Sequence, residues 1–111
     1  MFGLSFGSQS IPVTEAYERL GTDGHVLLDV RTREEVRAEG IAGALNIPLD
    51  RLETEAARLK EYASIHVICR SGGRSSVATT ILHGLGLGQT ANVSGGIIAW
   101  QKAGLPITHQ H

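Results

Sequence analysis

Short apolar runs of strand length alternate with helix-like segments along this 111-residue chain, and this alternation constrains the fold more than any other feature. The strand-like runs are 11–13, 25–30, 44–48, 65–68 and 91–93. The helix-like segments are about 15–20, 32–39, 50–62, 74–85 and 95–103. Strands that alternate with helices require crossover connections, which join parallel strands. We therefore predict an α/β fold with a parallel β-sheet of about five strands and helices on both faces.

Polar residues at the starts of these segments predict where three helices begin. Thr14 has the character of an N-cap for the first helix. Thr32 and Glu35 have the spacing of a capping box, and so do Asp50 and Glu53. The last pair predicts a helix through about residue 62, with an apolar face that is buried against the sheet.

The length of the chain favours a single domain with its own core. We expect that domain over residues 10–107, after a flexible lead-in over 1–9 and before a tail over 108–111. His109 and His111 are two metal-ligating side chains without a third, so we expect no metal site and a frayed tail.

Charge and cysteine content restrict the partners and the compartment. The formal net charge of −1 gives no general attraction to nucleic acid or to a membrane surface. The N-terminus lacks the basic and apolar regions of a signal peptide, and no run has the length of a membrane span. A single cysteine excludes an internal disulfide and suits a reducing compartment, so we expect a cytoplasmic protein without nucleic-acid or membrane partners.

That single cysteine, Cys69, ends a strand-like run and is followed by a glycine-bearing loop and a helix-like segment. Loop N–H groups, the helix N-terminus and the charges of Arg70 and Arg74 would all favour a thiolate and lower the pKa of the thiol. The alternative is a buried structural cysteine at a strand end. Because ligands of parallel sheets bind beyond the carboxyl ends of the strands, the position of Cys69 favours a reactive site.

Three separated motifs resemble those of the rhodanese family, specifically its single-domain sulfurtransferases. They are the N-terminal signature at 27–35 and 43–48, the active-site loop at 69–75 and the C-terminal signature at 95–106. The resemblance spans about residues 10–107. Gly40 and Ala42 stand where the family often has histidine and proline, a difference that concerns local rigidity more than chemistry.

The resemblance implies a sulfurtransferase without a cofactor. Sulfane sulfur would pass from a thiosulfate-like donor to cyanide or a thiol through a persulfide on the catalytic residue, Cys69. The substrate-binding residues would be those of the loop after it: Arg70, Ser71, Gly72, Gly73, Arg74 and Ser75. The same chemistry would suit a persulfide carrier that serves a partner protein.

Asp29 and Arg31 are expected to support the loop from the end of a neighbouring strand. Asp29 would either pair with Arg74 or bond to the backbone of the following turn. Glu35 is expected in a structural ion pair, since a thiolate with a low pKa needs no general base.

The length of the loop separates sulfur transfer from two related activities. Four residues lie between Cys69 and Arg74, whereas phosphatases and arsenate reductases of the related fold have five. The shorter loop suits one sulfur atom rather than a tetrahedral oxyanion, so we rank those activities lower. A catalytically silent interaction module is disfavoured by the intact loop.

Two further residue types have structural interpretations. His25 and His66 are expected at the surface or at strand ends, and His83 in a structural position on its helix. Trp100 is expected to anchor the core.

Overall fold

A computed structural model describes residues 9–109 of the chain. Within them, five parallel strands form one sheet in the order β1-β5-β4-β2-β3. The strands are β1 (Ser10–Ile11), β2 (His25–Asp29), β3 (Leu45–Asn46), β4 (Ser64–Ile68) and β5 (Thr90–Val93). β2 and β4 lie in the middle and are buried along nearly their whole length, as expected for apolar runs in a parallel sheet.

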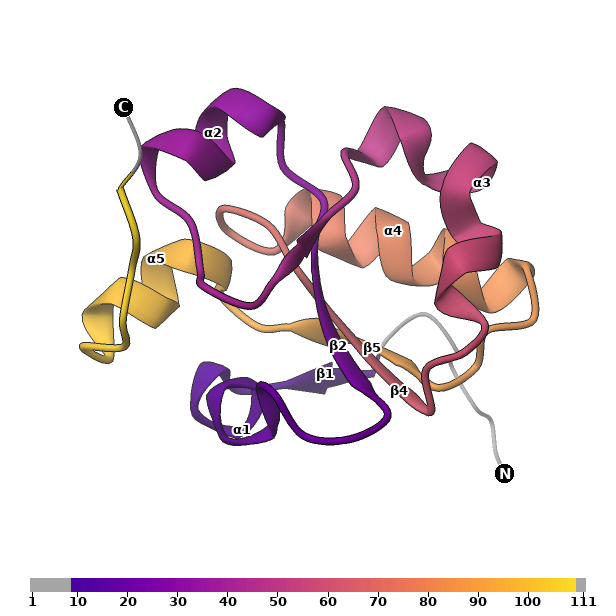
Figure 1. Cartoon of the computed structure of the whole chain (residues 1–111), viewed down its shortest axis with the longest axis horizontal. Helices are drawn as coiled ribbons and strands as arrows, with labels where there is room; N and C mark the ends of the chain where they lie inside the picture. The colour runs from indigo at the N-terminus through magenta and orange to yellow at the C-terminus, as the bar shows by residue number, and fades with distance from the viewer. Residues whose placement is uncertain (1–8, 110–111) are drawn as a thin grey trace.

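Helices cover both faces of this sheet, which confirms the predicted fold class (Figure 1). α1 (Val13–Arg19) and α5 (Gly96–Lys102) pack on one face, where Trp100 is fully buried as predicted. α3 (Leu52–Glu55) and α4 (Gly73–Gly84) pack on the other face. The two apolar clusters alternate along each central strand: Leu27 faces α1 and α5, and Leu28 faces α3 and α4.

The helix α2 (Arg33–Ala38) lies at the carboxyl edge of the sheet, near the viewer's top in Figure 1. Its start confirms the predicted capping box. The Glu35 N–H donates to Thr32 Oγ1, and the Thr32 N–H donates to a Glu35 carboxylate oxygen. Two N–H groups of the first turn are thus satisfied, and Glu35 is held at a fixed place on the helix.

Two predicted helix starts are wrong. α1 begins one residue before the predicted cap, at Val13, and the fixed φ of Pro12 makes that residue the N-cap instead of Thr14. The segment predicted as one helix over 50–62 is divided into the 3₁₀ turn η2 (Leu49–Arg51), α3 and the 3₁₀ turn η3 (Ala56–Leu59). Leu52, Ala56 and Leu59 on its apolar face are nevertheless buried, because 3₁₀ and α turns place side chains three or four residues apart on similar faces. Ala63, which is expected on the same face, is exposed.

His25 lies at the start of β2, one of the two expected positions, whereas His66 lies inside β4 and not at the surface or at a strand end. They lie on neighbouring strands with 7% and 5% of their surface exposed, and their ring centroids are 4.3 Å apart. Both rings contact Ser64 Oγ at 3.3 Å. Burial, the other ring and the charge of Arg19 lower the pKa of His66 to about 4, so this ring is neutral at neutral pH.

The ends of the described chain contact the body. Gln9 accepts a hydrogen bond from the Asn92 N–H of β5, and the rest of the predicted lead-in lies outside the described residues. In the predicted tail, Thr108 pairs with Gly40 in an antiparallel bridge, and His109 Nδ1 lies 2.9 Å from the Ala38 carbonyl oxygen at the end of α2. A Cβ on Gly40 would lie 2.6 Å from the Val36 carbonyl oxygen and 3.3 Å from Thr108 Oγ1, so glycine permits the chain to pass closely between α2 and Thr108.

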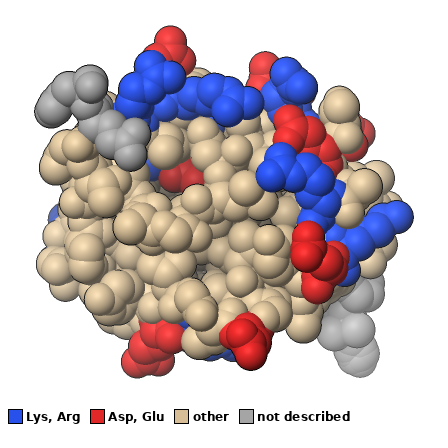
Figure 2. Space-filling model, viewed as in Figure 1, with Lys and Arg blue, Asp and Glu red and all other residues tan. Residues whose placement is uncertain are grey.

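Figure 2 shows that acidic and basic side chains are interspersed along the edge over α2 and α3, and that much of the remaining viewed face is uncharged. Among residues 9–109, every helix is too short or too polar to cross a membrane.

Candidate active site

Cys69 follows the last residue of β4, in the centre of the sheet's carboxyl edge. The residue is 1% exposed, and it belongs to the apolar cluster on the α3 and α4 side. After it the chain turns through residues 70–72 and enters α4 at Gly73. The strand, the loop and the helix thus occur in the order that the sequence predicted.

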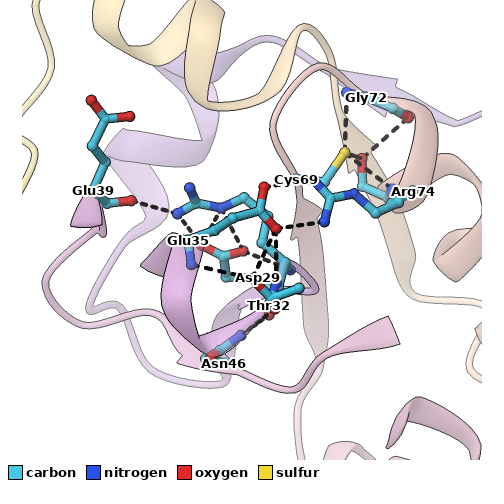
Figure 3. A network of polar contacts seen from close by, with 10 residues as sticks. Asp29, Thr32, Glu35, Glu39, Asn46, Cys69, Gly72 and Arg74 are labelled. Atoms are coloured by element: carbon cyan, nitrogen blue, oxygen red, sulfur yellow. Dashed lines mark hydrogen bonds and ion pairs between the residues drawn. The ribbon is translucent and has the colours of Figure 1, made fainter. Parts of the chain in front are cut away.

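The loop folds around the sulfur and directs N–H groups at it (Figure 3). The Gly72 N–H donates to Cys69 Sγ over 3.1 Å, and the Ser75 N–H donates over 3.3 Å. The Ser75 side-chain oxygen lies 3.3 Å from the same sulfur. Gly72 has a φ of 110°, a left-handed conformation that glycine adopts without strain and that turns the chain into the helix.

The first turn of α5 holds the outside of the loop. The Ile97 N–H donates to the Cys69 carbonyl oxygen over 2.9 Å, and the Ile98 N–H donates to the Arg70 carbonyl oxygen over 3.1 Å. These bonds turn the loop carbonyls toward α5, which leaves the inside of the loop to N–H groups. The approach is so close that a Cβ on Gly96 would lie 2.3 Å from the Cys69 carbonyl oxygen.

The pKa of the Cys69 thiol lies below its ordinary value. Burial is the largest single effect and opposes ionisation, but hydrogen bonds from the Ser75 hydroxyl and from the N–H groups of Ser75, Gly72 and Ser71 together outweigh it. The direction agrees with the sequence-based expectation. The loop N–H groups contribute as expected, the Ser75 hydroxyl adds to them, and arginine charge is not among the causes.

Arg74 pairs with Glu35 and not with Asp29, which corrects one of the two predicted arrangements. Arg74 Nη1 and Nη2 donate to Glu35 Oε1 and Oε2 over 2.7 and 2.8 Å (Figure 3). Arg74 extends from the first turn of α4 toward α2, where the capping box presents the Glu35 carboxylate. The hydrogen bonds from Arg74 lower the pKa of Glu35 to about 2, so this carboxyl is a charged partner in an ion pair, as expected for Glu35.

Asp29 instead accepts a hydrogen bond from the Arg31 N–H over 3.0 Å, which confirms the predicted bond to the following turn, and it also pairs with the Arg31 side chain. Arg31 Nη2 donates to Asp29 Oδ2 over 2.8 Å, Arg31 Nε donates to Asp29 Oδ1 over 3.0 Å, and both side chains are buried. Arg31 also donates to the Glu39 carbonyl oxygen at the end of α2, and Asn46 donates to the carbonyl oxygens of Asp29 and Arg31. The pair thus fixes the β2–α2 connection on which Glu35 and Arg74 depend, without a contact to the sulfur.

The remaining loop residues face outward. Arg70, Ser71 and Gly73 are exposed, and no carboxylate within residues 9–109 forms an ion pair with Arg70. The structure therefore separates the donors around the sulfur, among them the Ser71 N–H, from the Arg70 and Ser71 side chains, which are open to solvent.

Sequence reasoning missed Asn92, on β5. Asn92 is 8% exposed, and its Oδ1 accepts a hydrogen bond from the Ser75 hydroxyl. A polar residue in a short buried strand, next to the strand that carries Cys69, is the signal that identifies it. Among the described residues, no three histidine, cysteine or acidic side chains gather in the manner of a metal site.

Comparisons with known proteins agree with this geometry. The model of the rhodanese-like domain matches residues 12–103. A sulfurtransferase of Allochromatium vinosum is 36% identical over 86 residues, which cover 78% of this chain and 80% of that protein. Thiosulfate sulfurtransferase 16, chloroplastic, of Arabidopsis thaliana is 38% identical over 109 residues, with 87% of this chain and 90% of that protein covered.

A solved structure agrees as well. The crystal structure of a rhodanese-related protein from Thermoplasma volcanium superposes with a TM-score of 0.81 at 34% identity, covering 90% of this chain and 97% of that one. The fold, the matched residues and the cysteine loop at the carboxyl edge lead to one family: this chain belongs to the rhodanese-like domains.

Proposed function

We propose that this protein is a thiosulfate-type sulfurtransferase, in which Cys69 carries sulfur as a persulfide between an anionic donor and a thiophilic acceptor. The family and its sulfurtransferase relatives support sulfur transfer in general. The choice of donor, the persulfide and the residue roles are our proposal. One observation carries it: a single sulfur atom lies inside a short loop whose Gly72 and Ser75 N–H groups both point at it.

The first half-reaction begins with the Cys69 thiolate. It attacks the outer sulfur of thiosulfate, a new S–S bond forms, and the bond to the sulfonate group breaks so that sulfite leaves with the electron pair. The lowered pKa of the thiol increases the fraction of thiolate, so we assign no general base to this step. The exposed Arg70 attracts the dianion, and Arg74 adds positive charge beside it, partly balanced by Glu35.

In the second half-reaction the acceptor, cyanide or a thiolate, attacks the outer sulfur of the persulfide. The S–S bond breaks, and its electron pair returns to Cys69 as thiolate. The same donors that stabilise the resting thiolate stabilise this leaving group, because hydrogen bonds to a charged sulfur are stronger than those to a neutral one.

Loop geometry favours sulfur over phosphate. With Gly72 and Ser75 donating directly to Sγ, the four residues between Cys69 and Arg74 leave little room for a tetrahedral group inside the ring of donors. Stabilisation of this kind requires donors within about 3 Å of the charged atom. We therefore expect negligible hydrolysis of aryl phosphates and negligible arsenate reduction.

Intact-mass measurement after incubation with thiosulfate tests the proposal. The wild-type protein should gain one sulfur atom at Cys69 and lose it to cyanide, whereas folded Cys69→Ser protein should neither gain the mass nor turn over thiosulfate. Persistent thiosulfate:cyanide activity in Cys69→Ser protein, or phosphatase turnover without a persulfide, would reject the assignment.

The carrier alternative shares the persulfide and differs in its acceptor. A carrier should form the persulfide yet release it slowly to cyanide and to small thiols. Rapid multiple turnover with those acceptors favours the enzyme.

A further inference from the structure

The Ser75 hydroxyl has one proton and three neighbouring atoms that can accept it. They are Cys69 Sγ at 3.3 Å, the Gly72 carbonyl oxygen at 3.3 Å, and Asn92 Oδ1, which is the nearest of the three. A hydroxyl donates to one acceptor at a time. Which acceptor receives the hydrogen bond from Ser75 therefore depends on the charge of each acceptor.

We propose that Asn92 is a positioning residue, which accepts the Ser75 proton while the Cys69 sulfur is uncharged and yields it when that sulfur becomes a thiolate. This inference rests on the proposed role of Cys69 as the nucleophile.

The uncharged state follows from the contacts. With the Ser75 O–H donating to Asn92, the Ser75 oxygen presents its lone pairs to the sulfur at 3.3 Å, and the thiol S–H donates to it. These contacts form a chain of hydrogen bonds that runs from Cys69 through Ser75 to Asn92. Ser75 has none of its surface exposed and Asn92 only 8%, so water competes little for these bonds.

The charged state reverses one bond. A thiolate has no proton to donate and is a stronger acceptor than a neutral amide oxygen, so the Ser75 O–H turns from Asn92 to the sulfur. In the persulfide the inner sulfur is uncharged, and the proton returns to Asn92. Each time an acceptor removes the outer sulfur, a third donor joins the Gly72 and Ser75 N–H groups as charge arrives on Cys69.

Asn92 thus opposes ionisation of Cys69 through Ser75, and its removal should make the thiol more acidic. The test measures the rate of alkylation of Cys69 by iodoacetamide against pH. Leucine has nearly the shape of asparagine. In Asn92→Leu protein, the midpoint of the alkylation rate against pH should fall by about 0.5–1 pH unit, which is equivalent to one hydrogen bond. In Ser75→Ala protein the midpoint should rise, since a donor is lost.

The double variant decides the mechanism. In a Ser75→Ala background, Asn92→Leu should leave the midpoint unchanged, because no hydroxyl connects Asn92 with the sulfur. Thr90→Val serves as the matched control. Thr90 is a buried polar residue on the same strand, and its hydroxyl donates to the Leu87 carbonyl oxygen and not toward Cys69, so its replacement should not shift the alkylation midpoint. Asn92→Ala replaces Asn92→Leu if the latter fails to fold.

The titratable and charged groups around the Cys69–Ser75–Asn92 hydrogen bonds are the same in all variants, so their effects on the alkylation midpoint cancel when variants are compared. They are Arg70 in the loop, Arg74 and His83 on α4, Glu35 on α2, Asp29 and Arg31 at the end of β2, and His66 on β4.

An unchanged or raised midpoint in Asn92→Leu protein, or an equal fall with and without Ser75, would overturn the inference. Alkylation requires no sulfur donor. If the alkylation midpoints shift as expected but thiosulfate forms no persulfide, the proposed function is refuted while the role of Asn92 is supported.

Discussion

Arg74 and Glu35 join the loop after Cys69 to α2 through two parallel hydrogen bonds of 2.7 and 2.8 Å. The two residues are 39 positions apart in the chain and come from different helices. Each side chain is about one-third exposed, so the pair is accessible to solvent and to an arriving anion. Arg74 therefore has a resident carboxylate with which an anionic donor must compete.

We predict that Glu35→Gln lowers the KM for thiosulfate, because the Arg74 guanidinium is released from its carboxylate. Glutamine still fits the capping box with Thr32, so the start of α2 should be retained. An exposed ion pair contributes about 1 kcal/mol or less, which corresponds to a change in KM of at most about fivefold. Glu34→Gln, on the same turn without an ion pair in the described residues, is the control. A KM that is unchanged or higher would show that Arg74 does not meet the donor.

The same pair predicts a loss of stability in strong acid. The pKa of Glu35 is about 2 in the folded protein, below the value of 4.5 for an unperturbed glutamate. Its contribution is fully present above pH 4.5 and is lost as the pH falls toward 2. Urea unfolding of wild-type and Glu35→Gln protein should therefore differ at pH 6 and converge near pH 2.

A second and larger pH effect should come from His66. Its pKa is about 4 when folded and 6.5 when unperturbed, so the neutral ring contributes fully above pH 6.5 and its contribution is lost as the pH falls toward 4. Between pH 7.5 and 5, we expect the free energy of unfolding to decrease by about 2 kcal/mol from this residue.

His66→Gln should make that decrease smaller, while His109→Gln, a change at an exposed histidine, should leave it unaltered. Denaturant titrations at the two pH values provide the measurement. An equal pH dependence in wild-type and His66→Gln protein would contradict the assignment to this ring.

We predict that one glycine inserted after Gly72 reduces sulfur transfer severely. The insertion would widen the loop between Cys69 and Arg74 from four residues to five and would move the Gly72 and Ser75 N–H groups away from the sulfur. Because each lost donor to a charged atom costs about 1.5–3 kcal/mol, a fall of at least about tenfold in kcat/KM for thiosulfate is expected. The insertion should also raise the midpoint of Cys69 alkylation. Full activity in the longer loop would refute the size argument.

We predict that Gly96→Ala disrupts the site. Its φ is 57°, and an added Cβ would lie 2.3 Å from the Cys69 carbonyl oxygen and 2.5 Å from that of Arg70. The loop would have to move away from α5, at a cost of about 2–4 kcal/mol in stability or with loss of the low thiol pKa. Gly88→Ala is the control, because nothing lies within 4 Å of its added Cβ. Melting temperature and alkylation midpoint together report both outcomes.

Local patterns were sufficient to predict most of the fold and the centre of the site. The apolar runs before Asp29 and Cys69 identified the central strands, and Thr32 with Glu35 identified the start of α2. These signals succeed because burial and capping act over a few neighbouring residues.

Contacts between distant segments were not predictable in the same way. Whether Arg74 meets Asp29 or Glu35 depends on where α2 lies, and the sequence alone left that open. The burial of His25 and His66 depends on the pairing of β2 with β4 and on what covers the N-terminal ends of these strands. Asn92 was missed because its partner Ser75 is 17 positions away and the two meet only once β5 pairs with β4.

The support of the cysteine loop by α5 has a consequence for the order in which the site can be assembled. The carbonyl groups of Cys69 and Arg70 are held by N–H groups of Ile97 and Ile98, which the ribosome adds almost thirty residues later. A growing chain that has reached β5 already contains the thiol, the loop and α4, yet lacks the segment that turns the loop inward. The backbone contacts that hold the loop carbonyls away from the sulfur are therefore completed only after the last helix has been synthesised.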